Sequence, residues 1–396
     1  MSHTTVIEID SQQFITNLQA IRKEIDAQVS NRHKSETQVF TTQAFATHMS
    51  KTKICLPVKA NAYGHGLVGI AKLAQPYVDY LAVSCLDEGI TLRQHGIDKP
   101  ILVFGAFNKD EIAGLIANNL EITVSSQYKA EQLASHCQAT NQVCRVHLKI
   151  DTGMNRVGVK VTSARGLFEC VQLYPQLQIT GVYSHLASSD SDDPTFTLEQ
   201  IASFKSIVDY AKSINPDIIC HLANSGGVCY YPGAYFDMVR PGILSYGYFP
   251  SRKINKIITS PLNQIKPCFS LKSRIIYTKM VDKDKGISYN QTYITKQYTR
   301  VVTVPIGYGD GYRRILSNIG EVLIQGKKYT VAGSICMDML LVDIGPNGQG
   351  RVEDEVVLIG CQGNEEITLA SVADKCNTII YEVLCGFNDR IPRIYI

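Results

Sequence analysis

The run from Leu56 to Gly66, Leu-Pro-Val-Lys-Ala-Asn-Ala-Tyr-Gly-His-Gly, holds the residues of clearest chemical potential in this 396-residue chain. An apolar segment ends there in Lys59, and an asparagine, a tyrosine and two glycines follow. At the end of a buried strand a lysine is poorly solvated, which lowers its pKa and frees the amine to attack a carbonyl group. The alternative is a lysine whose stem is covered while its ammonium group reaches water.

Eight short apolar runs recur through the first 240 residues, and most are separated by segments with helical spacing or helix-forming composition. Eight strands that alternate with helices over about 200 residues predict an α/β fold, a (β/α)8 TIM-type barrel. A doubly wound open sheet is the alternative, but no G-x-G-x-x-G follows an early strand. The runs are Cys55–Lys59, Tyr80–Ser84, Ile101–Phe104, Glu121–Val124, Val146–Ile150, Ile179–Ser184, Ile218–Leu222 and Phe236–Val239.

The alternation of apolar runs and helical segments ends near residue 260. Beyond it lie strand-like runs separated by Gly, Asn and Asp. One amphipathic helix interrupts them at about Leu369–Leu384, with Thr368 as its N-cap and Gly386 just beyond its end. We therefore predict a barrel domain over residues 1–258 and a mainly β C-terminal domain over 259–396. A polar segment at about 30–53 reads as an inserted helix or a loop between the first helix, from Ser11 to about Val29, and the first barrel strand.

Composition narrows the class of protein. Hydrophobic residues make up 45% and charged residues 19% of the chain, and its net charge is +3. These values are typical of a globular enzyme and predict neither a nucleic-acid nor a membrane partner. No apolar leader or long apolar run is present, and the 12 cysteines and nine histidines show no metal-ligand spacing. We expect reduced thiols, no metal site and a cytoplasmic location.

Further candidate residues follow the later predicted strands. Barrel enzymes place their chemistry at the C-terminal strand ends, and glycine-rich turns after strands seven and eight often bind phosphate. Taken singly, these turns could be plain turns, His185 could be a core histidine, and Lys149 could pair with Asp151, itself more typical of a cap or turn. The candidates are Lys149 to Arg156 after strand five, His185 after strand six, Asn224-Ser225-Gly-Gly after strand seven, and Arg240-Pro-Gly242-Ile243 after strand eight.

A family resemblance joins these stretches. Val-Lys-Ala-Asn-Ala-Tyr-Gly-His-Gly around Lys59 resembles the pyridoxal phosphate (PLP) lysine motif of the alanine racemases. Other stretches resemble motifs of the same family, in family order, over nearly the whole chain. They are His-Leu-Lys-Ile-Asp-Thr-Gly-Met-Asn-Arg (147–156), Tyr-Ser-His-Leu-Ala (183–187), Ala-Asn-Ser-Gly-Gly (223–227), Val-Arg-Pro-Gly-Ile (239–243), Ser-Tyr (288–289), Pro-Ile-Gly-Tyr-Gly-Asp-Gly-Tyr (305–312), Gly-Ser-Ile-Cys-Met-Asp (333–338), Tyr-Glu-Val (381–383) and Arg-Ile-Pro-Arg (390–393).

The resemblance implies a PLP-dependent homodimer that interconverts L- and D-alanine by a two-base mechanism and supplies D-alanine for peptidoglycan. It implies that Lys59 forms the Schiff base with PLP and serves as one acid/base group. Tyr289, from the partner subunit, is the second. The cofactor-binding residues that it implies, besides Lys59, are Tyr63, Asn224, Ser225, Gly242 and Ile243 near the phosphate, Arg240 at the pyridine nitrogen, and His185, which links Arg240 towards Tyr289.

The same resemblance places the substrate. Arg156 and the backbone near Met337 correspond to the groups that hold its carboxylate, and Lys149 matches a lysine that is carbamylated in many members. The chain departs from the family at Asp389, which aligns with an aromatic residue that helps to wall the substrate pocket in many members. Three alternatives remain: a racemase of broader range that also accepts serine, a decarboxylase of the same fold, and a PLP carrier without catalysis.

Asp389 in place of an aromatic residue predicts measurable racemisation of serine, because a smaller wall admits a hydroxymethyl group. The measurement is the loss of optical activity of L-serine and L-alanine under identical conditions. If serine turnover falls below alanine turnover by more than about 10⁴-fold, a pocket that rejects serine exists despite Asp389.

Overall fold

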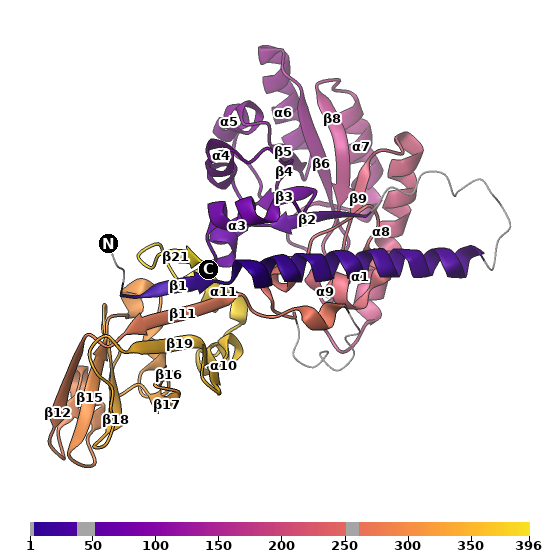
Figure 1. Cartoon of the computed structure of the whole chain (residues 1–396). Helices are drawn as coiled ribbons and strands as arrows, with labels where there is room; N and C mark the ends of the chain where they lie inside the picture. The colour runs from indigo at the N-terminus through magenta and orange to yellow at the C-terminus, as the bar shows by residue number, and fades with distance from the viewer. Residues whose placement is uncertain (1–3, 38–51, 251–260) are drawn as a thin grey trace. The chain divides into compact units, whose positions relative to one another are not determined.

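The computed structural model describes residues 4–37, 52–250 and 261–396, which belong to two compact units (Figure 1). The barrel unit comprises Gln13–Ala62 and Leu67–Pro267, and the β unit comprises Met1–Gln12, Tyr63–Gly66 and Cys268–Ile396. The predicted domain boundary at 258/259 lies outside the described residues and stays a prediction.

The barrel unit contains eight parallel strands in a closed ring. Their hydrogen-bonded order is β5-β4-β3-β2-β10-β9-β8-β6, and pairing of β5 with β6 closes the ring. The predicted TIM-type barrel is thus confirmed. The strands are β2 (Lys53–Pro57), β3 (Tyr80–Val83), β4 (Ile101–Val103), β5 (Glu121–Val124), β6 (Cys144–Asp151), β8 (Leu177–Tyr183), β9 (Ile219–His221) and β10 (Met238–Val239).

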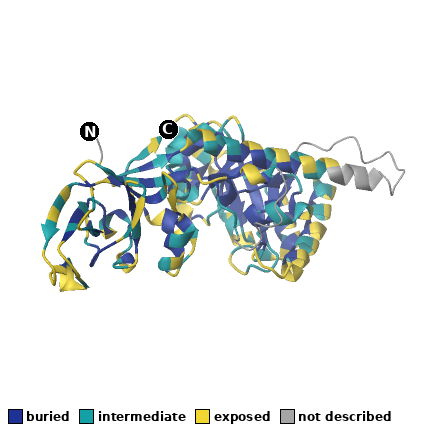
Figure 2. Ribbon diagram, turned by 60° about the horizontal axis from the view of Figure 1, so that its bottom comes forward, coloured by how far each residue is buried: buried dark blue, intermediate teal, exposed yellow. Residues whose placement is uncertain are grey.

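Helices follow most of these strands and cover the outside of the ring (Figure 1). Every residue of β3, β4 and β5 is buried, as expected for parallel strands covered on both faces, and Figure 2 shows buried residues throughout the barrel interior. The helices are α1 (Ser11–Thr37), α3 (Leu67–Ala74), α4 (Leu86–Gln94), α5 (Ile112–Ala117), α6 (Gln127–Thr140), α7 (Ala164–Gln172), α8 (Thr195–Ile214) and α9 (Ser225–Tyr230). Helix α1 extends into the predicted 30–53 insertion, of which residues 38–51 are not described.

The β unit consists mainly of β-strands, as predicted, and most of its strand pairs are antiparallel. Its largest sheet has the order β17-β16-β19-β11-β1-β21, with β20 paired to β19. The chain start belongs to this sheet, because β1 pairs antiparallel with β11 and parallel with β21. The strands are β1 (Val6–Ile9), β11 (Phe269–Arg274), β16 (Glu321–Ile324), β17 (Lys327–Thr330), β19 (Glu355–Gln362), β20 (Glu365–Ile367) and β21 (Arg393–Tyr395), with a second sheet of β12 (Tyr277–Val281), β15 (Thr299–Val304) and β18 (Leu340–Gly345).

The helix predicted at Leu369–Leu384 is two helices, α10 (Leu369–Lys375) and α11 (Ile380–Gly386). Thr368 is the N-cap, as predicted, and accepts a hydrogen bond from the Ser371 N–H at 3.0 Å. The chain leaves the helix at Asn377, whose φ of 51° is left-handed. Gly386 is the last residue of α11, so its predicted position beyond the helix is wrong.

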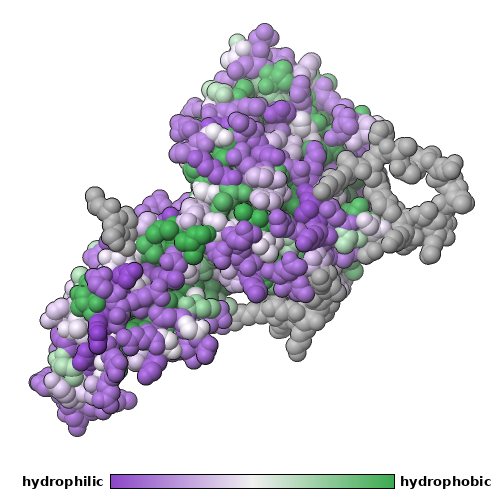
Figure 3. Space-filling view, in the orientation of Figure 1, coloured by the Kyte–Doolittle hydropathy of each residue, from purple (hydrophilic) through white to green (hydrophobic). Residues whose placement is uncertain are grey.

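On the face drawn in Figure 3, hydrophilic residues predominate over both units and hydrophobic ones form small separate groups. None of the helices within the described ranges has both the length and the apolar character needed to span a membrane. Across the same residues, no three His, Cys, Asp or Glu side chains are grouped so that they could hold a metal ion.

Candidate functional site

Lys59 opens an unusual turn at the C-terminal end of the barrel. Strand β2 ends at Pro57, two residues earlier than predicted, and Lys59–Tyr63 form a single helical turn, α2. From Ala60 to Tyr63 all four residues have φ between 53° and 54°, in the left-handed region. Residues other than glycine lose roughly 1–2 kcal/mol each in this conformation. The turn therefore needs strong support from its surroundings.

That support comes mainly from Glu88 on helix α4. Its Oε1 accepts a hydrogen bond from the Ala60 N–H at 2.6 Å, and its Oε2 accepts one from the Ser84 N–H at 2.7 Å. The Asn61 side chain accepts a third from the Leu67 N–H at 2.7 Å. Hydrogen bonds to a carboxylate are stronger than neutral ones, so Glu88 fixes the backbone that carries Lys59. Such strain is typical of functional sites.

Arg240 follows β10 and is buried, with 3% of its surface exposed. Its Nη1 donates to His221 Nδ1 at 2.7 Å, and its Nη2 donates to the carbonyls of Ser184 at 2.7 Å and Leu222 at 2.9 Å. The predicted link to His185 is longer, with Nη2 3.4 Å from His185 Nδ1. Burial lowers the pKa of Arg240 to about 10, so the guanidinium keeps its charge at neutral pH.

Several cations gather at this end of the barrel. Lys149, on β6, is buried, and its Nζ donates to the carbonyl of Ile150 at 2.9 Å. Burial, followed by the charge of Arg240, lowers the pKa of Lys149 to about 7; Asp151 opposes this shift and Arg156 adds to it. Much of the Lys149 amine is therefore neutral at pH 7.

The same positive charges affect the protonation of His185. Burial and then the charges of Arg240, Arg156, Lys149 and Lys59 hold the pKa of His185 well below its ordinary value, so its imidazole is neutral. Asp151 acts as the turn residue suggested by the sequence, because its Oδ1 accepts hydrogen bonds from the N–H groups of Gly153 and Asn155 at 2.9 and 3.1 Å. The predicted lysines and arginines of the barrel unit thus lie within electrostatic range of one another and favour an anionic ligand.

The loops after β9 and β10 meet through Ser225, whose Oγ accepts a hydrogen bond from the Leu244 N–H at 3.2 Å. Asn224 caps helix α9, with its Oδ1 accepting from the Gly227 N–H at 3.0 Å. A Cβ on Gly226 would lie 2.4 Å from Ser189 Oγ, so close packing requires this glycine. Gly242 and the buried Ile243 precede Leu244 in the second loop. The structure thus brings together the two loops predicted to bind phosphate.

The other predicted residues belong to the β unit. The Tyr63 ring lies 6.1 Å from the Tyr381 ring, and burial raises the pKa of Tyr63. Tyr289 is 69% exposed, and its carbonyl accepts a hydrogen bond from Ser334 Oγ at 3.1 Å. Met337 is also exposed, and its carbonyl accepts one from the Gly309 N–H at 2.8 Å. The Asp389 side chain is 91% exposed, 3.6 Å from Arg393 Nη1.

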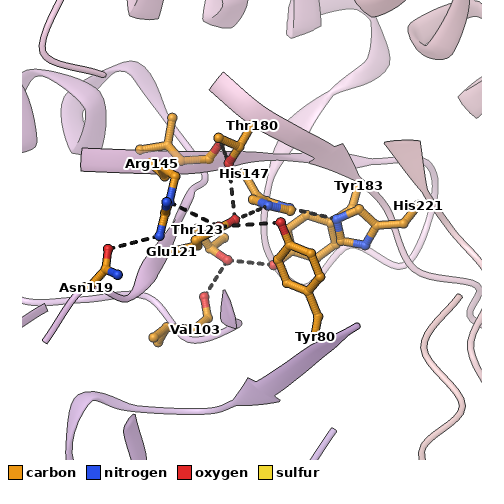
Figure 4. A network of polar contacts seen from close by, with 11 residues as sticks. Tyr80, Val103, Asn119, Glu121, Thr123, Arg145, His147, Thr180, Tyr183 and His221 are labelled. Carbon is orange, nitrogen blue, oxygen red and sulfur yellow. Dashed lines mark hydrogen bonds and ion pairs between the residues drawn. The ribbon is translucent and has the colours of Figure 1, made fainter. Parts of the chain in front are cut away.

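Four buried residues that the sequence motifs do not single out, Glu121, His147, Tyr183 and His221, lie in or beside the barrel strands near Arg240. His221 Nε2 lies 2.8 Å from His147 Nδ1, and His147 Nε2 lies 2.8 Å from Glu121 Oε2. The Tyr183 ring stacks on His221 with 4.8 Å between centroids and 6° between planes. Figure 4 shows these residues converging inside the barrel. His147 and Tyr183 lie within the family motifs given above. For His221 and Glu121, the only indication in the sequence is that each is a polar residue in a strand predicted to be buried.

PLP is a phosphorylated aldehyde with a pyridine ring, and the barrel unit offers a group for each of these three parts. Lys59 is held by a rigid turn, and the buried Arg240 supplies a fixed cation. The Ser225 hydroxyl joins the two loops that could hold a phosphate. These donors match an aldehyde, an aromatic nitrogen and a phosphate, so the residues present fit the cofactor.

Comparisons with known proteins agree with this chemistry. The family model described as the N-terminal domain of alanine racemase matches residues 41–250, and that of the C-terminal domain matches 268–395. The chain belongs to the alanine racemase family. It is 41% identical to an alanine racemase of Halothermothrix orenii, with 87% of this chain and 90% of the relative covered. For an alanine racemase of Carboxydothermus hydrogenoformans the identity is 40%, with 86% and 91% covered.

Solved structures of the alanine racemase family resemble this one over its whole length. The alanine racemase of Clostridium difficile has a TM-score of 0.87 at 33% identity, with 100% of this chain and 96% of that chain covered. The alanine racemase of Bacillus anthracis with bound L-Ala-P has a TM-score of 0.88 at 30% identity, with the same coverage.

The left-handed turn yields a prediction. Replacing Ala60 by valine should lower the free energy of unfolding by about 1–2 kcal/mol more than Ala139→Val, an exposed alanine in helix α6, because a β-branched residue is strongly disfavoured at φ 54°. Urea unfolding followed by circular dichroism measures the difference. Equal losses for the two variants would show that the turn is not strained.

Proposed function

We propose that this chain is a PLP-dependent racemase that interconverts L- and D-alanine and supplies D-alanine for peptidoglycan. The observation that carries the proposal is the placement of Lys59 and Arg240 at the C-terminal strand ends of a barrel whose family is alanine racemase. When bound, PLP supplies an electron-withdrawing ring that makes the Cα proton of the amino acid acidic.

Lys59 would hold the cofactor through its amine and, with substrate bound, would move a proton at one face of the substrate Cα. Tyr289 moves a proton at the opposite face. Two groups on opposite sides account for racemisation in both directions, since each removes the proton that the other delivers. Arg156 and the backbone near Met337 bind the substrate carboxylate.

Arg240 would face the pyridine nitrogen and oppose its protonation, because the charge of the guanidinium persists at neutral pH. His185 would connect Arg240 towards Tyr289, and Tyr63, Ser225, Gly242 and Ile243 would hold the phosphate. The Asn224 side chain caps helix α9, so its proposed part in cofactor binding is to support the loop that carries Ser225.

We also propose a homodimer in which Tyr289 reaches the partner's site. A tyrosine that is 69% exposed on a folded chain is well suited to be covered by another subunit. The cytoplasmic location remains part of the proposal and rests on the family. A broader racemase is the second candidate, because the exposed Asp389 replaces an aromatic wall.

The function is tested with the PLP-loaded enzyme and L-alanine. Optical activity should decay to zero without release of CO2, whereas a decarboxylase releases CO2 and a carrier changes nothing. Lys59→Ala should lose the visible absorbance of the lysine-bound cofactor and nearly all turnover, while the exposed-lysine variant Lys160→Ala keeps both. A Lys59→Ala enzyme with unchanged absorbance and turnover would refute the assignment.

Lys149 is predicted to form a carbamate. Its pKa of about 7 leaves much of the amine neutral, so the nitrogen can bond to the carbon of CO2 and release a proton. The resulting anion would turn the repulsion from Arg240 and Arg156 into attraction. Enzyme in ¹³C-bicarbonate should show a carbamate carbon resonance that Lys149→Ala loses and Lys160→Ala keeps. A resonance that survives in Lys149→Ala would exclude this lysine.

A further inference from the structure

A row of four buried groups crosses the interior of the barrel from Glu121 to Arg240, and we call Glu121, His147, His221 and Arg240 the relay. Glu121 Oε2 lies 2.8 Å from His147 Nε2, and His147 Nδ1 lies 2.8 Å from His221 Nε2. Arg240 Nη1 lies 2.7 Å from His221 Nδ1. None of the four is more than 3% exposed. Figure 4 shows His147 between Glu121 and His221.

The chemistry of the two ends fixes the direction of every hydrogen bond in the relay. Arginine can only donate, so His221 Nδ1 must accept and the proton of a neutral His221 lies on Nε2. That proton is donated to His147 Nδ1, which places the His147 proton on Nε2, facing the carboxylate of Glu121. A carboxylate only accepts, so both ends require the same pair of tautomers. Burial, then the charge of Arg240, lowers the pKa of His221 and keeps this ring neutral.

The surroundings of Glu121 require an ionised acid. Besides His147, its oxygens face Arg145 Nε at 3.2 Å and Thr180 Oγ1 at 3.2 Å, with Tyr80 Oη at 3.5 Å. All of these groups can donate a hydrogen bond to the carboxylate. A glutamine side chain in the place of Glu121 would turn its own N–H donor towards one of them. Burial acts to raise the pKa of Glu121, but the hydrogen bond from His147 and the charge of Arg145 oppose it, and the pKa is lowered.

The fold makes room for the relay. Glu121 is the first residue of β5, whereas Arg240 follows β10, so the row runs from the N-terminal towards the C-terminal end of the barrel. Gly181 leaves space for the His147 ring, because a Cβ there would lie 2.3 Å from His147 Nδ1. The Tyr183 ring stacks on His221 and limits its rotation. Such packing and hydrogen bonding lock side-chain conformations around a functional group.

We infer that Glu121 is a positioning residue for the reaction: through His147 and His221 it fixes the orientation of the Arg240 guanidinium and offsets its buried charge. This inference rests on the proposed function, in which Arg240 faces the cofactor nitrogen. Glu121 itself touches neither cofactor nor substrate.

The first test needs no variant. In the PLP-loaded enzyme labelled with ¹⁵N-histidine, the side-chain nitrogen resonances of His147 and His221 should both show a protonated Nε2 and an unprotonated Nδ1 at pH 7–8. A protonated Nδ1 on His221 would overturn the relay. This readout is independent of turnover, so a wild-type enzyme that fails to racemise alanine refutes the proposed function and leaves the relay testable.

The second test compares Glu121→Met with Asp79→Asn. Met fills a similar space without an acceptor, and the half-exposed Arg145 can turn to solvent. Asp79 is a matched control because it also binds an arginine, Arg22 at 3.0 Å, and a backbone N–H, that of Ile54 at 2.7 Å, but is not part of the relay. We expect kcat for alanine to fall by about tenfold or more in Glu121→Met with KM within about threefold, and Asp79→Asn to keep the wild-type kcat.

Glu121→Gln serves as the conservative variant and as the fallback if Glu121→Met does not fold. It keeps an acceptor oxygen but loses the charge, so kcat should lie between those of the wild type and Glu121→Met. If every Glu121 variant that folds has a kcat within twofold of that of Asp79→Asn, Glu121 has no positioning role. This outcome would overturn the inference even if the two histidines have the expected tautomers.

Discussion

The buried charge of Arg240 is the constraint on which the rest of the site depends. A guanidinium removed from water is tolerated only when its N–H groups are satisfied, and here the carbonyls of Ser184 and Leu222 and the ring of His221 accept from it. These acceptors lie at the ends of β8 and β9; β9 is next to β10 in the ring, and β8 is the strand beyond it. Burial and then this charge lower the pKa values of His185, His221 and Lys149. After burial, Arg240 is therefore the main influence on protonation at this end of the barrel.

Much of this fold could be predicted from the sequence, because its signals are local. Eight apolar runs of strand length separated by helical segments indicate the barrel, and the structure confirms the ring of parallel strands. The residues after the strands could also be placed at one end, since parallel strands of a closed barrel point the same way. The motif around Lys59 pointed to the family that the comparisons confirm.

Other features depend on contacts between distant parts of the chain, which no local pattern reveals. The left-handed turn after Lys59 exists because Glu88, 28 residues beyond Ala60, binds its backbone. Strand β1 pairs with β11 and β21, so the chain start belongs to the β unit. His221 is a closer partner of Arg240 than His185, and only side-chain geometry distinguishes them. The contacts of the relay could not be predicted for the same reason. A glutamate at the start of an apolar strand is typical of an exposed strand end, and nothing in the local sequence indicates that Glu121 is buried.

The central claim is that each site combines Lys59 of one chain with Tyr289 of its partner, and a mixed dimer tests it most directly. Lys59→Ala and Tyr289→Phe, each expected to be inactive alone, are unfolded together, refolded with PLP, and assayed for racemisation of L-alanine while mass measurement confirms mixed dimers. Random pairing makes about half of the dimers mixed, and each mixed dimer has one site with both residues intact, so roughly a quarter of wild-type activity should return. Activity no higher than that of the separate variants would contradict the shared site.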